Sequence, residues 1–317
     1  MRTPWLRSIV LILAVFALVG AACANDSGGS SGNGGNSGGG STSSGGTGVC
    51  ASVDPSGSDA LARICSSEKL RIATDQKYKP QSWYDVKTGT WKGFDVDVAT
   101  EIAKRLGVAP DIQHQDWDVV TAGSWNDRWD VSVGSMTDTV PREELFAFTP
   151  AYYYTPAGVA VFGTNTSYSA ISDLSGKKVC VGEKTTYESY LEGSLTLGGV
   201  APPFTYQISD PHVFTTKTDT DALDQLNLGD GVRCDAAVSA VPTIQQYIDD
   251  GGNVKFLGDP IFYEPLSVAF DKNDPVDNST LADAVNKIIE DMHADGTLTA
   301  LSMQWYGIDL TTQAASS

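Results

Sequence analysis

The chain has 317 residues, enough for about two domains, and its formal net charge is −18 with an isoelectric point near 4.4. The acidic balance argues against a nucleic-acid-binding protein, because phosphates require a basic protein face. Hydrophobic residues make up 41% of the chain and charged residues 19%, which suits a globular protein with an ample core.

The N-terminus has the features of an export signal. Arg2 and Arg7 precede the apolar run SIVLILAVFALVG, which is too short for a convincing membrane-spanning helix. The run ends in GAAC, which resembles the lipobox at which bacterial lipoproteins are cleaved and acylated. We therefore expect residues 1–22 to be a lipoprotein signal peptide and Cys23 to carry the lipid anchor. The alternative is an ordinary secretory signal with an incidental cysteine.

Residues 23–48 follow as a segment rich in glycine and serine. The segment has almost nothing to bury, so burial cannot offset the entropy lost on ordering. Its composition predicts a flexible tether between the anchor and the folded region.

Four cysteines remain after Cys23, an even number for an oxidising compartment. Four cysteines allow three connectivities. We expect the pairs Cys50–Cys65 and Cys180–Cys234, because each pair lies within one proposed structural unit. The chain has no CxxC pair, and its three histidines are scattered without ligand spacing, so we expect no metal site and no cofactor.

Strands and helices alternate in the first half of the folded region. KLRIAT, residues 69–74, alternates apolar and polar side chains as a strand does. Residues 93–107 place apolar side chains at fourfold spacing on one face of a helix. Further strands are expected at 111–114 and 130–135, and this order predicts a parallel sheet with helices on its faces.

The second half repeats this type of unit. Strands are expected at 177–182 and 235–240, and a helix follows at 241–251. The most regular helical pattern of the chain runs from Leu281 to Met292.

Two β-rich stretches, 151–162 and 259–270, join the halves. If both cross between the halves, lobe 2, residues 157–258, is inserted into lobe 1, which comprises residues 49–156 and 259–317. A ligand would then bind between the lobes, outside the carboxyl ends of the strands.

This organisation resembles the solute-binding proteins of ABC importers, in particular the family for polar amino acids. The similarity covers roughly residues 68–307. Five motifs carry it, in chain order: ATDQKY, GFDVDVATEIAKRL, DVSVGSMTDTVPRE, LSGKKVCVGEKTT and DMHADGTLTALSMQWYG. The resemblance implies an α/β, two-lobed periplasmic-binding-protein (Venus-flytrap) fold, with a sheet flanked by helices in each lobe and a two-strand hinge. It also implies a monomer that delivers solute to ABC permease transmembrane subunits.

The segment SMTDTVPRE contains Arg142, the cationic residue expected to bind the solute. In the family, the arginine that matches Arg142 binds the α-carboxylate of the ligand. A planar guanidinium can hold both carboxylate oxygens in parallel hydrogen bonds. Pro141 can begin a short helix whose free N–H groups also favour an anion. The alternative is a surface arginine paired with Glu143 or Glu144.

The resemblance places other residues around the same ligand. Some have alternative roles: Thr185 and Thr186 stand at a predicted helix N-terminus, where a hydroxyl can cap the helix instead, and Tyr78 and Trp117 can be core residues. The full set of expected further contacts is Gly134, Ser135, Thr137, Asp75, Tyr78, Trp117, Thr185, Thr186, Tyr187 and Ser239.

One position departs from the family pattern. The aspartate that usually receives the ligand's α-ammonium is replaced by Ala240. An ammonium buried without a carboxylate would cost several kcal/mol. Either Asp75 or Asp138 supplies the charge, with Asp75 preferred, or the ligand is not an ordinary α-amino acid.

The function implied by the resemblance is capture of a small carboxylated solute between two lobes, followed by delivery to a permease; we expect no enzyme activity. One alternative is an enzyme on the same scaffold, similar to cyclic-acid dehydratases, with Glu183 as the obvious carboxylate of lobe 2. The other alternative is a lipoprotein that senses a solute on behalf of a receptor.

Overall fold

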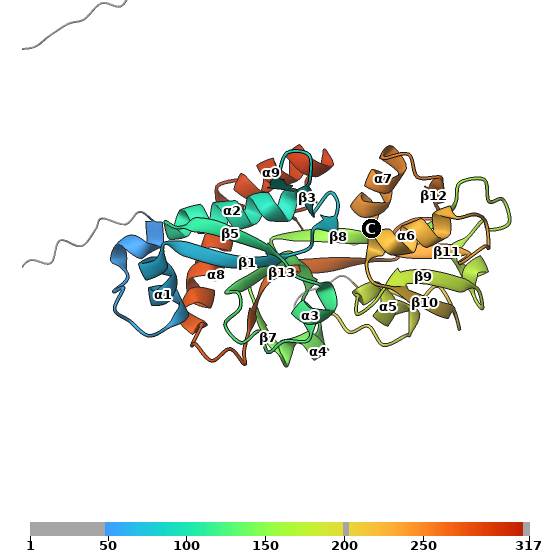
Figure 1. Ribbon diagram of the computed structural model, residues 1–317. Helices are drawn as coiled ribbons and strands as arrows, with labels where there is room; N and C mark the ends of the chain where they lie inside the picture. The colour runs from blue at the N-terminus through green and yellow to red at the C-terminus, as the bar shows by residue number, and fades with distance from the viewer. Residues whose placement is uncertain (1–47, 199–202, 313–317) are drawn as a thin grey trace, which may run out of the picture. The chain divides into compact units, whose positions relative to one another are not determined.

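Strands and helices alternate along the chain, as the sequence predicts (Figure 1). The computed structural model describes residues 48–198 and 203–312, so the expected signal peptide, Cys23 and most of the tether lie outside the described residues. None of the helices in these two ranges is long and apolar enough to cross a membrane. Before the first long strand the elements are η1 (Gly48–Ser52), α1 (Ala60–Ser67), β1 (Lys69–Thr74), β2 (Lys77–Tyr78), β3 (Ser82–Asp85), β4 (Thr90–Lys92), α2 (Phe94–Leu106), β5 (Ala109–His114), α3 (Trp117–Thr121), β6 (Val131–Thr137), α4 (Val140–Glu143) and β7 (Phe146–Phe148).

The two β-rich stretches form the two longest strands, β8 and β13. From β8 onwards the elements are β8 (Tyr153–Phe162), η2 (Ile171–Leu174), β9 (Lys178–Gly182), α5 (Thr186–Leu191), β10 (His212–Thr216), α6 (Asp219–Asn227), β11 (Ala236–Ala240), α7 (Val241–Asp249), β12 (Val254–Phe256), β13 (Phe262–Asp271), α8 (Ser279–Ala294) and α9 (Thr297–Tyr306).

Among the described residues, the main sheet has ten strands, and its central path is β10-β9-β11-β8-β13-β6-β1-β5. β1 pairs in parallel with β5 and β6, and β9 pairs in parallel with β10 and β11. β8 and β13 pair antiparallel with each other between these two groups. The predicted two-strand hinge is therefore confirmed, and the sheets of the two lobes are continuous through it. β2, β3 and β4 form a separate antiparallel sheet.

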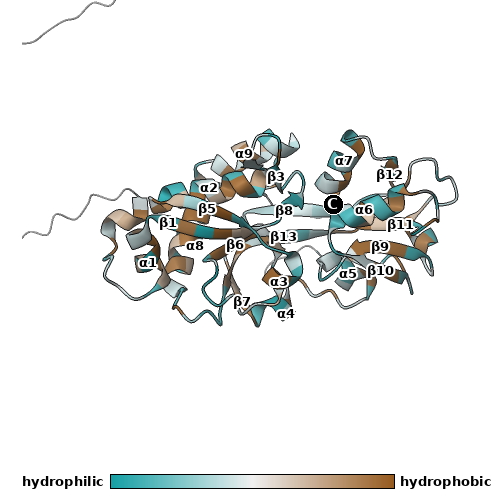
Figure 2. Cartoon of the chain, viewed as in Figure 1, coloured by the Kyte–Doolittle hydropathy of each residue, from teal (hydrophilic) through white to brown (hydrophobic). Residues whose placement is uncertain are grey.

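Each group of strands has its own hydrophobic core. α2 packs on β1, β5 and β6, whereas α6 packs on β9 and β11 (Figure 1). Brown, apolar segments follow the strands and the helix faces turned toward them in both groups (Figure 2). On β8 the core changes between Tyr153 and Ala157, and on β13 it changes between Phe262 and Leu266. The change on β8 fits the proposed boundary at 156/157. On β13 it lies beyond the proposed boundary at 258/259, because Ile261 and Phe262 still pack in the core of lobe 2, so we propose that lobe 2 extends to Phe262.

Both expected disulfides are present. Cys50–Cys65 links η1 to α1, and Cys180–Cys234 links β9 to the turn before β11. The bonds close loops of 15 and 54 residues. Loop closure of these lengths restricts the unfolded chain by about 3 and about 4 kcal/mol. Each bond lies within one proposed lobe, so neither of them restrains movement at the hinge.

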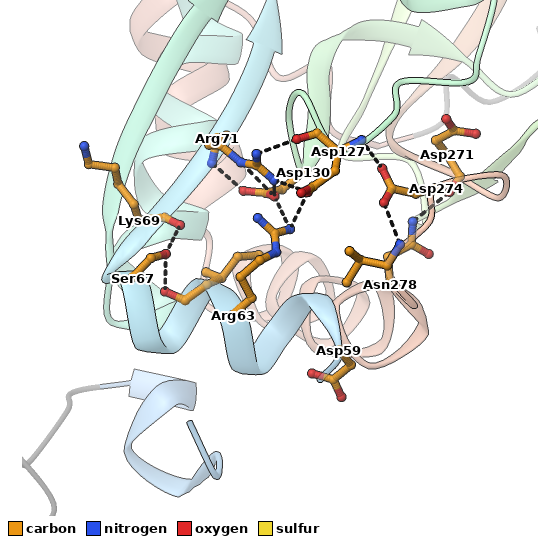
Figure 3. Close-up of polar contacts among 12 residues, drawn as sticks. Asp59, Arg63, Ser67, Lys69, Arg71, Asp127, Asp130, Asp271, Asp274 and Asn278 are labelled. Atoms are coloured by element: carbon orange, nitrogen blue, oxygen red, sulfur yellow. Dashed lines mark hydrogen bonds and ion pairs between the residues drawn. The ribbon is translucent and has the colours of Figure 1, made fainter. Parts of the chain in front are cut away.

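A charged cluster holds α1 against the rest of lobe 1 (Figure 3). Asp130 has a fully buried side chain, and its Oδ1 accepts hydrogen bonds from Arg63 and Arg71, each at 2.6 Å. Arg71 also donates to Asp127 at 2.5 Å, and the backbone N–H of Asp127 donates to Asp274. Removing one partner of such a buried pair is strongly destabilising. The cluster thus ties α1, β1 and the segment after β13 into one body.

A second polar network shapes the end of β6 where polar residues gather. The buried carboxylate of Asp95, in the first turn of α2, accepts hydrogen bonds from Ser135 at 2.7 Å and Tyr152 at 2.8 Å. Tyr152 in turn accepts the backbone N–H of Ser135. Ser135 has a φ of 56°, which is uncommon for a residue with a side chain. The network holds Ser135 in this conformation, and burial raises the pKa of Asp95 to about 7.

Asp95 should make stability fall as pH rises from about 4 to about 7. Its native pKa of about 7 lies above the value of about 3.9 in an unfolded chain, so within this window the folded chain binds the proton more tightly. Each pH unit then lowers the free energy of unfolding by on the order of 1 kcal/mol. Urea denaturation at several pH values should show a shallower decline for Asp95→Asn, which cannot titrate; equal slopes in both proteins would contradict the assignment.

Candidate functional site

The expected ligand contacts come together around one cavity. Its volume is about 60 Å³, room for a few water molecules. The cavity lies beside the hinge, and both proposed lobes contribute to its wall. The lining residues are Asp75, Tyr78, Trp117, Gly134, Ser135, Thr137, Arg142, Thr185, Thr186, Tyr187, Lys217, Thr218, Asp219 and Glu264. Of the expected contacts only Ser239 does not line the cavity, and Lys217, Thr218, Asp219 and Glu264 were not expected.

Arg142 extends its guanidinium into the cavity. One terminal nitrogen donates to the carbonyl of Thr137 and the other to the carbonyl of Lys184, each at 2.9 Å. The guanidinium carbon lies 5.2 Å from the centre of the Trp117 ring, a cation–π distance. Burial lowers the pKa of Arg142 to about 10, and the nearby Glu264 carboxylate opposes this shift. Arg142 therefore keeps its charge at neutral pH.

The surface alternative for Arg142 finds no support. Among residues 48–198 and 203–312, Arg142 forms no ion pair with Glu143 or Glu144. The helix expected from Pro141 begins one residue earlier, at Val140. Its N-cap hydroxyl, from Thr139, accepts the backbone N–H of Arg142 at 3.4 Å. The expectation that this helix start offers free N–H groups to an anion is therefore wrong, because the N–H of Val140 also donates, to the carbonyl of Thr196, and Pro141 has no N–H.

Glu264 is the residue that the sequence analysis missed at the centre of the site. It lies on the hinge strand β13 and is only 2% exposed. Its carboxylate accepts four hydroxyl groups: Thr137 at 2.6 Å and Thr186 at 2.5 Å on Oε2, and Tyr187 at 2.5 Å and Thr155 at 3.3 Å on Oε1. An ionised carboxylate has about four lone-pair sites, so these donors fill it.

The donors to Glu264 come from both proposed lobes. Thr137 and Thr155 belong to strands β6 and β8, and Thr186 and Tyr187 open helix α5. Three of these four hydroxyl residues were expected to contact a ligand directly. Each of the three donates its hydroxyl hydrogen to Glu264 and also lines the cavity. Their hydroxyl oxygens remain able to accept a hydrogen bond from a ligand.

Asp219, the first residue of α6, was also missed. It is 6% exposed, and its Oδ2 accepts a hydrogen bond from Ser239 at 3.0 Å. Its Oδ1 is buried and has no hydrogen-bond partner among the described residues. Burial, followed by the charges of Glu264 and Asp75, raises the pKa of Asp219 to about 7. Ser239 thus faces Asp219 rather than the cavity.

The two aspartates expected to supply negative charge have other surroundings. Asp75 lines the cavity, and its Oδ1 accepts the backbone N–H of Lys77 at 2.8 Å, the bond of a strand-end turn. Burial raises the pKa of Asp75. Asp138 is not among the lining residues, and burial with the nearby Glu143 raises its pKa to about 6. The structure therefore favours Asp75 over Asp138, and it brings Asp219 to the cavity as well.

The remaining expected contacts combine two roles. Thr185 caps α5, because it accepts the N–H of Glu188 at 3.1 Å, and it donates to the carbonyl of Gly182 at 2.7 Å. Trp117 donates its indole N–H to the carbonyl of Lys184 at 3.2 Å. Burial, with the charges of Asp219 and Glu264, raises the pKa of Tyr78 well above its ordinary value, so Tyr78 is a neutral hydroxyl. All three also line the cavity.

Direct contacts join the proposed lobes around the cavity. The carbonyl of Lys184 accepts from both Arg142 and Trp117. Outside the cavity, Lys217 pairs with Asp116 at 2.7 Å and Lys79 pairs with Asp250 at 3.0 Å. These last pairs are largely exposed, so each contributes little to stability. The contacts describe a closed arrangement of the two lobes.

Comparison with known proteins places the chain in context. The L-cystine-binding protein TcyA of Bacillus subtilis (strain 168) is 25% identical over 261 residues, 80% of this chain and 87% of TcyA. The L-cystine-binding protein TcyJ of Escherichia coli (strain K12) is 28% identical over 255 residues, 79% of this chain and 87% of TcyJ. The crystal structure of the ancestral amino acid-binding protein AncCDT-1, a precursor of cyclohexadienyl dehydratase, matches with a TM-score of 0.65 and 26% identity, covering 78% of this chain and 99% of that one.

The family model covers most of the folded region. The sequence model of the bacterial extracellular solute-binding proteins, family 3, matches residues 70–308. This range contains every residue that lines the cavity and both hinge strands. The chain therefore belongs to the bacterial extracellular solute-binding proteins, family 3.

Proposed function

We propose that this protein captures a small amino acid or amino-acid derivative in the cavity beside its hinge and delivers it to an ABC permease. Membership of the family supports an extracytoplasmic solute-binding role, and relatives named for L-cystine support an amino-acid ligand. The observation that carries the proposal is the guanidinium of Arg142 inside a cavity lined by both lobes.

Arg142 is proposed to hold the carboxylate of the solute. Its two recorded hydrogen bonds use one N–H of each terminal nitrogen, and a guanidinium has five N–H groups. The free N–H groups can meet a carboxylate with direction as well as charge. The ring of Trp117 and the backbone carbonyls of Thr137 and Lys184 hold the group in place, which lowers the entropy lost on binding.

Closure around the solute is proposed to be a population shift. Lobe 1 supplies Arg142 and Ser135, and lobe 2 supplies Thr186 and Asp219. A solute that contacts both sets binds the closed state more tightly than the open one. It moves the equilibrium only by that difference in affinity. The closed form would then be the one that a permease recognises.

We further propose that Cys23 anchors a monomer to the membrane. The support is the GAAC segment behind a short apolar run, together with the glycine- and serine-rich segment that follows. An acylated lipoprotein cysteine carries more than one chain, and more than one chain is needed for stable anchoring. The tether would let the folded region reach a permease in the same membrane.

The alternative enzyme would need a carboxyl group of raised pKa at the solute. Glu183, the carboxylate expected for this role, does not line the cavity, whereas Asp219 does and has a raised pKa. Incubation with amino acids and cyclic carboxylic acids separates the two functions. A binding protein returns the solute unchanged in stoichiometric amount, and an enzyme consumes many equivalents.

Replacing Arg142 by alanine should abolish solute binding. The carboxylate loses its cationic partner, so a panel of the twenty amino acids and L-cystine should no longer raise the melting temperature. In the wild type, a solute at a hundredfold excess over its Kd should stabilise the fold by about 2.7 kcal/mol. Differential scanning fluorimetry measures both effects.

Arg233→Ala is the matched control for this experiment. Arg233 is exposed in the turn before β11 and does not line the cavity, so its removal should leave the solute response intact. Circular dichroism should show that both variants keep the wild-type fold. If Arg142→Ala responds to solute as the wild type does, Arg142 is not the residue that binds the carboxylate of the solute.

Replacing Cys23 by alanine should release the protein from the membrane. Without the thiol no lipid can be attached, and the folded region has no helix in its described residues that could replace the anchor. Fractionation of cells that express wild type and variant measures the change, and mass spectrometry of the wild type should find acyl chains on Cys23. Wild-type protein that is cleaved elsewhere and carries no lipid would refute the anchor.

A further inference from the structure

The unpartnered carboxylate oxygen of Asp219 has no counterpart in the expected site. From its position we infer that Asp219 is the cation subsite of the cavity and that it receives a positively charged nitrogen of the solute that still carries N–H groups. The inference rests on the proposed function, since Arg142 is taken to hold the other end of the same solute. It adds a residue to the proposed site and requires that the cationic nitrogen of the solute carry an N–H group.

The carboxylate of Asp219 is held in a fixed place. Ser239, on β11, donates to Oδ2 at 3.0 Å. Gly182, the last residue of β9, lies against Oδ1: a Cβ at that position would come within 2.4 Å of this oxygen. The missing side chain of Gly182 therefore makes room for Asp219. Two strand ends and one helix start thus fix a carboxylate that is 6% exposed.

The carboxylate oxygen that lacks a hydrogen-bond donor is Oδ1. It is buried and has no hydrogen-bond partner among residues 48–198 and 203–312. A buried acceptor without a donor costs about 1–3 kcal/mol, and more when the group is charged. Asp219 lines the cavity, so a donor on a bound solute can reach the carboxylate. A charged N–H donor would satisfy both the hydrogen bond and the charge.

The charges around the cavity divide into two ends. Arg142 is the cation at one end, and Asp219, Glu264 and Asp75 together make the other end negative. The second lining cation, Lys217, pairs with Asp116 outside the cavity at 2.7 Å. Like charges that share a low-dielectric space repel each other, and a bound cation relieves this repulsion. A zwitterionic solute matches both ends at once.

Neither other acid of the cavity can take this role as well as Asp219. The four hydroxyl donors to Glu264 leave its oxygens no free lone pair. Asp75 already accepts the N–H of Lys77 in its strand-end turn. Ala240, at the end of β11, has no side-chain acceptor at all. The cation partner is therefore assigned to the start of α6, and the negative charge of Glu264 on the hinge strand adds to the attraction.

The hydrogen-bond requirement sets a limit on the solute. A primary or secondary ammonium supplies the N–H that Oδ1 lacks. A quaternary ammonium has the same charge but no donor, so Oδ1 would stay unpaired in the complex. We therefore expect an amino acid to bind and its N,N,N-trimethyl derivative to be rejected, as is usual for sites built around a hydrogen bond.

Isothermal titration with Asp219→Asn tests the subsite. The probe is the amino acid from the panel above that stabilises the wild type most. Loss of a buried charge partner should weaken its binding by at least about 30-fold. Asp221→Asn is the matched control, because Asp221 lies two residues further along α6 and does not line the cavity. The Kd of this control should remain within about threefold of the wild-type value, because half-buried Asp221 lies outside the cavity.

The outcomes separate the two proposals. If no panel member binds the wild type at millimolar concentration, the amino-acid function fails, and the subsite fails with it. If the wild type binds and Asp219→Asn binds equally well, the subsite is wrong and the role of Arg142 stands. A second test needs no variant and so does not depend on its folding. The wild type should bind the probe at least about 30-fold more tightly than the N-acetyl and N,N,N-trimethyl derivatives of that probe; equal affinities would overturn the inference.

Discussion

The carboxylate of Glu264 is the interaction on which the closed arrangement depends. It stands on a hinge strand, at the point where the chain passes from one hydrophobic core to the other. Two of its hydroxyl donors come from β6 and β8 and two from α5. A buried carboxylate is stable only when its lone pairs are filled, so closure and the burial of Glu264 support each other. Opening the lobes would separate these donors and return part of the charge to water.

The fold could be predicted from sequence because its signals are local. The strand at 69–74 and the helix at 93–107 follow simple periodicities, and the structure places β1 and α2 there. The hinge was predictable for a different reason: 151–162 and 259–270 are β-rich stretches that join the two halves, and the family resemblance implies a two-strand hinge there. The segment around Arg142 was identified through its resemblance to the matching segment of the family, in which the arginine binds the ligand's carboxylate.

Glu264 and Asp219 could not be found in this way. Within FYEPLSVAF, a glutamate fits the alternation of a strand with one wet face, so its burial has no signature in the sequence. An aspartate at the start of a helix is ordinarily explained by the helix dipole, and Asp219 fits that pattern equally well. Their surroundings depend on residues far away in the chain: the four donors to Glu264 are 77 to 127 positions distant. Only the folded arrangement brings these groups together.

The contacts that close the lobes differ in kind from those proposed to select the solute. Arg142 and Trp117 of lobe 1 both donate to a backbone carbonyl of lobe 2, that of Lys184, and a carbonyl is present whatever the side chain. The proposed solute contacts use side-chain charges instead, Arg142 on lobe 1 and Asp219 on lobe 2. A solute with only a carboxylate would engage lobe 1 in the open and the closed state alike. It would then add nothing to the free energy that favours closure. Under the two proposals, a zwitterion engages both charges only when the lobes are shut, so the two charges that select the solute would also couple its binding to closure.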